Sequence, residues 1–241
     1  MSGGLLPAAD ISVGEHITRN WFGLTWNVDT MWGTVIAGAI VIGLGLLTAR
    51  SASSAVPGKL QLFFETVVEQ VEAQAGMDLK KRAPFVVPLA ITIFVFILTC
   101  NWLALIPSGH HPELLPPPTA DVNLTYALGL IISIWSIATG IRLRGTRSYL
   151  SHLKEPYVFL APINVLEELI KPFTLALRLF GNIFAGTVML LIFTLLPAYI
   201  LWLPNVGWKI FDLFIGLIQA FIFALLTLLY FGTAIGEAEA H

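Results

Sequence analysis

The chain contains 241 residues, of which 56% are hydrophobic and 12% are charged, and its formal net charge is −2. Because soluble domains carry roughly a quarter charged residues, this composition argues against a soluble monomer. A nucleic-acid-binding protein would need a basic surface that this chain lacks. The single cysteine, Cys100, excludes an internal disulfide and a metal site built from several cysteines.

The chain begins with a predicted external segment, residues 1–29, followed by a first predicted span, residues 30–50. The external segment lacks a basic start followed by an apolar run, so no cleaved signal peptide is expected. The span is uncharged between Asp29 and Arg50, and about 20 residues of helix cross the hydrocarbon layer. Helices are expected rather than a β-barrel, because ten-residue segments of alternating hydrophobicity are absent from the sequence.

Residues 59–76 have the pattern of an amphipathic helix. Apolar residues recur at helical spacing on one side: Leu60, Phe63, Phe64, Val67, Val68 and Val71. Polar residues occupy the other side: Gln61, Glu65, Glu69 and Glu72. The pattern predicts an interfacial helix on the cytoplasmic membrane surface, or equally a helix packed on a partner protein.

Two further uncharged stretches predict spans at 84–106 and 122–142, joined by a proline-rich external loop at 107–118. Lysine and arginine concentrate in alternate connections, which marks the cytoplasmic side. The connection after the first span holds five, the next holds none, and the connection after 122–142 holds four. This alternation predicts an N-terminus outside the cell and, with five spans, a cytoplasmic C-terminus.

The fourth predicted span, residues 162–196, is unusually long and contains a charge. Its 35 residues of helix would extend on the order of 50 Å, well beyond a ~30 Å hydrocarbon layer, so a strong tilt or a bend at Pro172 is expected. Arg178 lies inside it, where insertion scales assign a central arginine about +2.5–3.5 kcal/mol. Polar and small residues share its helical face: Glu167, Lys171, Thr174, Gly181, Asn182 and Ala185.

The face around Arg178 is predicted to meet a partner. Small residues allow a second helix to approach closely. The other acids deep in a span, Glu168 and Asp212, lie nearer to the span ends than to the middle, so the counter-ion is expected on a partner subunit. The alternative is that Arg178 pairs with an acid of its own chain and only holds helices together.

The last predicted span, residues 207–236, is expected to form a long tilted antiparallel hairpin with 162–196. In that pairing Gln219 lies near the depth of Arg178, and Asp212 lies further outside, opposite Thr187. Together with Asp212, one face of the last span carries Gly216, Gln219, Phe223, Leu226 and Tyr230.

Glu167 and Glu168 lie near the cytoplasmic end of the long helix. Acids on both sides of a fixed cation suit two aqueous half-paths separated by that cation. Simpler roles remain open: Asp212 favours a helix start, Glu167 can pair with Lys171, and Gln219 can bond between helices.

Four ordered motifs resemble subunit a of the F-type ATP synthase, the stator subunit of its membrane sector. They are NWLALIPSG (101–109), PTADVNLT (118–125), TLALRLFGNIFAG (174–186) and LIQAFIFALLTLLY (217–230). The similarity covers about residues 84–235, and the first 80 residues match only in general layout.

The resemblance implies that Arg178 faces a rotating ring of c subunits, each of which supplies a membrane carboxylate. It implies that Thr174, Gly181 and Ala185 face this ring and that Asn182 and Gln219 are polar neighbours of the arginine. It further implies peripheral-stalk b-type subunits as partners and a chain without cofactor, metal or catalysis of its own. The basic connections favour a bacterial plasma membrane over an organelle.

The mechanism that the resemblance implies is electrostatic. The arginine lowers the pKa of an approaching carboxylate, which releases its proton into the inner path. The carboxylate passes the arginine, is reprotonated from the outer path, and returns to lipid in the neutral form. A buried lysine could lose its charge, whereas arginine stays charged.

One position departs from the family pattern. Many relatives carry an acid where this chain has Thr187, and often a histidine where it has Asp212. We hypothesise that Asp212 alone carries the outer-path protonation role here.

Two other classes of function remain. A secondary transporter would use Arg178 to bind an anionic substrate, but internal repeats and paired broken helices are absent from the sequence. A structural scaffold would use the buried charges only to set helix register. An independent enzyme is disfavoured, because the sequence has neither a GxxxxGK[ST] loop nor a His-Cys cluster. We therefore predict an all-α polytopic membrane protein, with residues 1–241 forming one membrane domain.

Overall fold

The computed structural model describes most of the chain outside the predicted fourth span. The described residues are 18–21, 24–53, 57–103, 118–146, 170, 177, 181, 186, 188, 189, 192, 200 and 202–236. They form two strands, β1 (Thr18–Trp21) and β2 (Leu24–Asn27), a short 3-10 helix η1 (Pro118–Ala120) and six helices. The helices are α1 (Val28–Ser51), α2 (Lys59–Gln74), α3 (Met77–Arg82), α4 (Val86–Leu103), α5 (Val122–Arg144) and α8 (Trp202–Ile235).

Four helices of the described residues are long and apolar enough to cross a membrane: α1, α4, α5 and α8. They overlap the predicted spans 30–50, 84–106, 122–142 and 207–236. The predicted helical, multi-pass class is therefore confirmed. The fourth span, 162–196, is described only at separate positions, so the count of five spans and the hairpin remain predictions. The described positions from 170 to 192 are all helical.

The segment predicted as one interfacial helix, 59–76, ends earlier than expected. α2 stops at Gln74, and Ala75 caps it in an extended conformation before α3 begins. Gln61 lies on the predicted polar side, where its amide donates to Glu65 Oε1 at 2.7 Å, and it is buried there. Its amide bonds to both backbone groups of Ser53, so the residue closes the connection from α1 to α2.

The predicted external segment contains the two short strands, an element that an all-α expectation did not include. β1 and β2 pair antiparallel with Thr18 opposite Asn27, and β2 leads directly into α1. Threonine and tryptophan, which favour pleated structure, recur in both strands.

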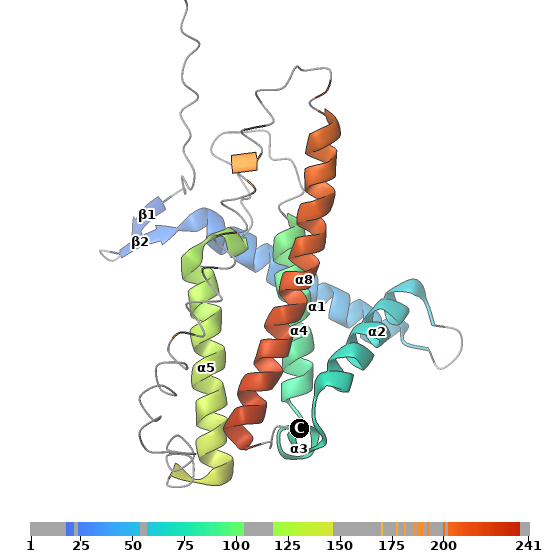
Figure 1. The fold of residues 1–241 in the computed structure, drawn as a ribbon, viewed down its shortest axis with the longest axis vertical. Helices are drawn as coiled ribbons and strands as arrows, with labels where there is room; N and C mark the ends of the chain where they lie inside the picture. Colours follow the sequence, from blue (N-terminus) through green and yellow to red (C-terminus); the bar gives the residue numbers. More distant parts are fainter. Residues whose placement is uncertain are drawn as a thin grey trace, which may run out of the picture.

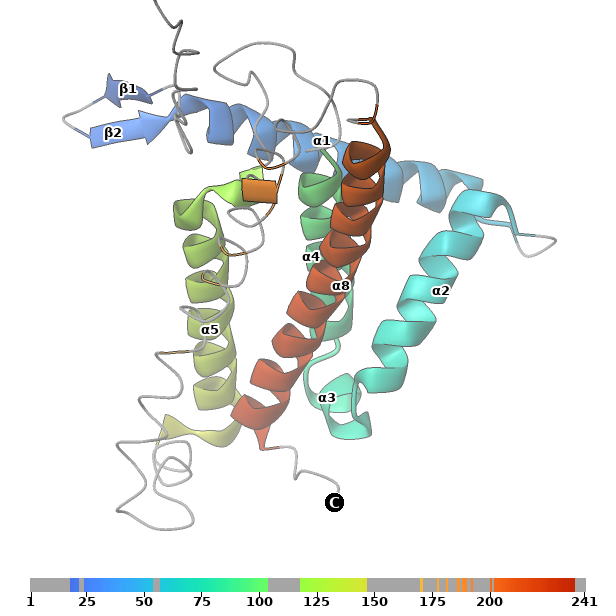
Figure 2. The same ribbon diagram turned by 45° about the horizontal axis from the view of Figure 1, so that its top comes forward.

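The helices pack in two directions. α4, α5 and α8 run side by side, and α1 crosses them at a steep angle (Figures 1 and 2). α2 runs from the far end of α1 back to α3, next to the start of α4 (Figure 2). Buried apolar residues of α4 and α8 form most of the core, among them Ala90, Phe94, Ile97, Ala220, Phe223 and Phe231.

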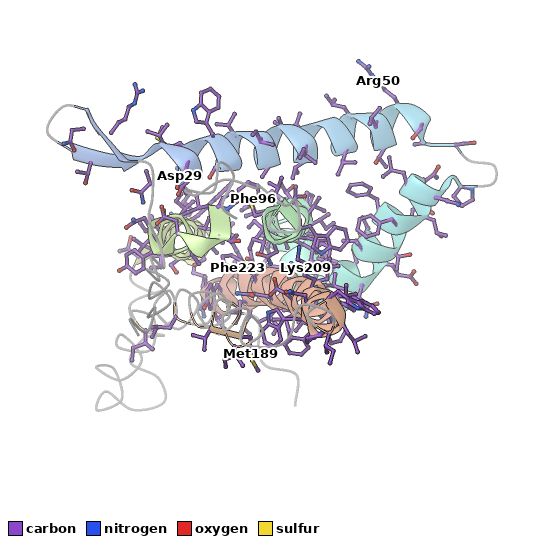
Figure 3. All side chains as sticks on the ribbon, turned by 90° about the horizontal axis from the view of Figure 1, so that it is seen from above. Asp29, Arg50, Phe96, Met189, Lys209 and Phe223 are labelled. Carbon is purple, nitrogen blue, oxygen red and sulfur yellow. The ribbon has the colours of Figure 1, made fainter. Side chains whose placement is uncertain are left out.

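α1 contributes little to this core. Its buried residues are confined to its first ten positions, Asp29, Thr30, Gly33 and Ala37. Viewed from above, Asp29 lies at the end of α1 nearest α5, and Arg50 projects away from the bundle at the other end (Figure 3). The N-terminal ends of α1 and α5 therefore meet, and the two helices diverge from that point.

Candidate functional site

The predicted site divides between described and undescribed residues. Asp212, Gln219 and Gly181 are described. The other predicted site residues lie outside the described residues: Glu167, Glu168, Thr174, Arg178, Asn182, Ala185 and Thr187. The part of the site that the structure defines is therefore the face of α8.

The predicted polar face of α8 is turned inward over most of its length. Asp212 is half-buried, and Gln219 is only 8% exposed. The residues that continue this face, Phe223 and Tyr230, are also buried, whereas Phe214 on another face is exposed. A carboxyl and an amide thus share the inner face of an otherwise apolar spanning helix, where polar groups are rare and often mark a function.

A polar bridge reaches this face from α4. Asn101 Nδ2 donates to the backbone oxygen of Gly216 at 3.0 Å, and Thr119 Oγ1 donates to Asn101 Oδ1 at 2.8 Å. Gly216 lies one turn after Asp212 and one turn before Gln219. Asn101 and Thr119 occur in the NWLALIPSG and PTADVNLT motifs, and the sequence analysis assigned neither a role.

A second polar cluster joins the N-terminal ends of α1 and α5. Asp121 Oδ2 accepts hydrogen bonds from Asn27 Nδ2 at 2.7 Å and Thr30 Oγ1 at 2.9 Å. Its other oxygen accepts from the backbone N–H of Asn123 at 2.9 Å, so Asp121 is the N-cap of α5. Asp29 lies nearby in sequence and is 4% exposed. The sequence analysis used both aspartates only as limits of spans, although an Asp directly before an apolar run is a recognised helix-start signal.

The C-terminal ends of α5 and α8 meet where an arginine packs over a glycine. The guanidinium of Arg144 packs over Gly236, the residue that ends α8 with a φ of +78°. A Cβ at Gly236 would lie 2.5 Å from Arg144 Cζ. Only glycine fits this backbone conformation and this contact without strain.

One described position of the predicted fourth span lies against α8. A Cβ at Gly186 would lie 3.7 Å from Trp208 Nε1. Gly186 is thus a described point of the predicted pairing between 162–196 and 207–236, whereas Arg178 and its depth lie outside the described residues. Gly181 is exposed, with open space where a Cβ would stand.

Comparison with known proteins gives a consistent result over nearly the whole chain. The sequence profile of the family described as "ATP synthase A chain" matches residues 31–232. The chain is 52% identical over 232 residues to the ATP synthase subunit a of Acidothermus cellulolyticus, covering 95% of this chain and 85% of that protein. It is 50% identical over 246 residues to that of Mycobacterium bovis, covering 97% of both chains. It is 47% identical over 250 residues to that of Mycobacterium leprae, covering 100% of this chain and 99% of that protein.

Proposed function

Because the chain belongs to the ATP synthase subunit a family, we propose that it conducts protons through the membrane sector of the complex and that Arg178 keeps two proton paths apart. The family places the chain among the ion-conducting membrane subunits of the ATP synthase rather than among its catalytic ones. One structural observation carries the finer proposal: α8, a spanning helix, holds half-buried Asp212 and buried Gln219 on one inward face.

Arg178 acts as the fixed charge at the barrier. The contact of Gly186 with Trp208 supports an antiparallel pairing with α8, and in the proposed pairing Arg178 lies near the depth of the segment from Gly216 to Gln219. A fixed cation at this depth favours the ionised form of a passing carboxylate and repels a proton that would leak directly between the paths. The carboxylate belongs to a c subunit of the rotor, which approaches over Thr174, Gly181 and Ala185. The open space beside Gly181 supports this approach.

The two paths lie on opposite sides of the arginine. Asp212 accepts and releases protons on the outer path, in place of the acid that many relatives carry at the position of Thr187. Glu167 and Glu168 line the inner path, and Asn182 and Gln219 are polar neighbours that orient the arginine. Each of these groups acts by hydrogen bonding or by proton exchange. Proton transfer is the only chemical step that the proposal assigns to the chain.

The proposed orientation rests on the concentration of lysine and arginine in alternate connections. In that orientation the cluster of Asp121 with Asn27 and Thr30, at the N-terminal ends of α1 and α5, lies on the outer side, and Arg144 with Gly236, at the C-terminal ends of α5 and α8, lies on the cytoplasmic side. α2 descends beside the bundle from the end of α1 to α3 (Figure 2), and its place on the cytoplasmic membrane surface is proposed from its amphipathic sequence alone. The chain thus sits in the plasma membrane with its N-terminus outside, next to peripheral-stalk b-type subunits.

The decisive test replaces Arg178 by alanine in the assembled complex. In membrane vesicles we expect Arg178→Ala to assemble, to lose ATP-driven proton pumping, and to admit protons passively. The matched control is Lys209→Ala, which removes an exposed positive charge from α8 and is expected to pump normally. Normal pumping by an assembled Arg178→Ala complex would overturn the mechanism and leave a structural scaffold. Substrate-dependent flux in liposomes containing this chain alone would favour a secondary transporter.

A further inference from the structure

The contact between Asn101 and Gly216 joins two helices that the mechanism needs in a fixed relation. Asn101 lies in the last turn of α4 and is half-buried. Its amide uses both ends, because Nδ2 donates to Gly216 O and Oδ1 accepts from Thr119 Oγ1. A backbone oxygen can only accept, so the carbonyl of Gly216 fixes which end of the amide faces α8.

The approach depends on glycine at position 216. A Cβ there would lie 3.1 Å from Asn101 Cβ and 3.4 Å from Asn101 Nδ2, distances at which the asparagine has to move. The absence of a side chain lets an α4 side chain reach the backbone of α8 directly. Gly207, in the same helix, has open space at its Cβ position and does not share this close approach.

The bridge from Asn101 is itself held in place by hydrogen bonds that involve η1 and Asp121. Thr119 is 3% exposed and belongs to η1, whose Pro118 oxygen accepts a hydrogen bond from the backbone N–H of Asp121. Asp121 is fixed in turn by the donors on α1. A connected set of hydrogen bonds therefore links the carbonyl of Gly216 to the N-terminal ends of α1 and α5.

From this geometry we propose that Asn101 is a positioning residue for proton transfer, which fixes the depth and rotation of the α8 face that carries Asp212 and Gln219. The inference rests on the proposed function, since it assigns Asn101 a role toward the same face. Both functional side chains lie within one turn of Gly216, so a small rotation of α8 about this point moves both relative to Arg178. Displacements of about 1 Å at a reacting group can change a rate by up to roughly a hundredfold.

Two substitutions break the contact from opposite sides. Asn101→Ala removes the donor, and Gly216→Ala keeps the asparagine but displaces it with a methyl group. Gly207→Ala is the matched control, because it adds the same methyl group to α8 where nothing lies within 4 Å. Each test variant is measured in the assembled complex, reconstituted in vesicles, for proton-driven ATP synthesis against the pH on the outer side.

We expect each test variant to assemble, to synthesise ATP roughly tenfold more slowly, and to show a shifted outer-pH profile. The double variant is expected to be no slower than the single variants, because both remove one interaction. Gly207→Ala should retain the normal rate and profile. The positioning role would be overturned if the outer-pH profile of ATP synthesis kept its midpoint. It would also be overturned if the rate losses of the two single variants multiplied in the double variant, or if both single variants failed to assemble.

The Arg178→Ala experiment separates this inference from the function on which it rests. Loss of pumping in Arg178→Ala, together with normal synthesis in both Asn101→Ala and Gly216→Ala, would refute only the role of Asn101. Normal pumping in Arg178→Ala would refute the proposed function itself.

Discussion

Thr30 donates a hydrogen bond from Oγ1 to Asp121 Oδ2 at 2.9 Å, which joins the starts of α1 and α5 across 91 residues of sequence. Asn27 donates to the same oxygen, and the other carboxyl oxygen caps α5. One buried carboxylate therefore caps the start of α5 and also holds the start of α1 by hydrogen bonds. Because its donors come from α1, the crosswise position of α1 depends on this residue.

Replacement of Asp121 by alanine should destabilise the chain. The variant loses a helix cap, worth about 0.5–2 kcal/mol, and leaves buried donors unpaired at about 1–3 kcal/mol. We expect Asp121→Ala to lower the thermal midpoint of the detergent-solubilised complex clearly, and Asp121→Asn to lower it much less, since asparagine also caps helices. Asp78→Ala, an exposed acid in the first turn of α3, serves as control. Equal midpoints for Asp121→Ala and the control would contradict the tie between α1 and α5.

Asp212 should be required for proton flux from the outer side. Asp212→Asn preserves size and hydrogen-bonding capacity but cannot exchange a proton at the carboxyl. We expect proton-driven ATP synthesis to fall by about 10²-fold, the lower end of the usual contribution of acid–base catalysis, while assembly is retained. Asp78→Asn is the exposed control. Unchanged proton flux in Asp212→Asn would refute the outer-path role and direct attention to other groups on that path.

Gly236 should tolerate no side chain. Gly236→Ala adds a Cβ into the Arg144 guanidinium and forces a non-glycine residue to a φ of +78°. The expected cost is about 1 kcal/mol or more from the backbone alone, seen as a lower thermal midpoint. Gly207→Ala, in open space on the same helix, should be stable or slightly stabilised. If Gly236→Ala and Gly207→Ala have the same thermal midpoint, Arg144 does not pack against the end of α8 as described.

Gln61 should control opening of the connection between α1 and α2. Its side chain accepts from Ser53 N–H and donates to Ser53 O, each at 3.1 Å. Loss of these two neutral hydrogen bonds, at about 1 kcal/mol each, corresponds to roughly thirtyfold faster local opening. We therefore expect Gln61→Leu to accelerate hydrogen exchange at the Ser53 amide by about that factor. Thr66→Val, on an exposed part of α2, should leave that amide unchanged, and an unaffected Ser53 in Gln61→Leu would disprove the closure.

The limits of the spans could be predicted from the sequence because charges are costly in lipid. α1 extends from just before Asp29 to just after Arg50, and α5 ends at Arg144. Apolar length indicates that a helix can cross the membrane, but it carries no information on the angle of crossing. The steep crossing of α1 over the other helices was therefore beyond the sequence analysis. The two strands were missed because four residues are too few for a reliable periodicity.

The site was predictable in its charged residues and not in its contacts. Asp212 and Gln219 stand out because polar side chains are rare in apolar spans. The bridge from Asn101 had no comparable signal, since its acceptor is a backbone oxygen and its second requirement is the missing side chain of Gly216. Gln61 was placed on the correct side of its helix, but its burial was not predictable, because helical periodicity does not register a hydrogen bond to the preceding connection.

The length of α8 also affects the order of events under the proposed function. Its 34 residues extend about 51 Å, so to remain inside a ~30 Å hydrocarbon layer the helix has to lean by roughly 55° from the membrane normal. At that angle Asp212 and Gln219, which are seven positions apart, differ by only about 6 Å in depth but by about 9 Å sideways. A rotor carboxylate that moves within the membrane plane then meets these two side chains one after the other. The position of each residue along α8 therefore sets the order in which the carboxylate reaches it. Reversing the direction of rotation reverses that order.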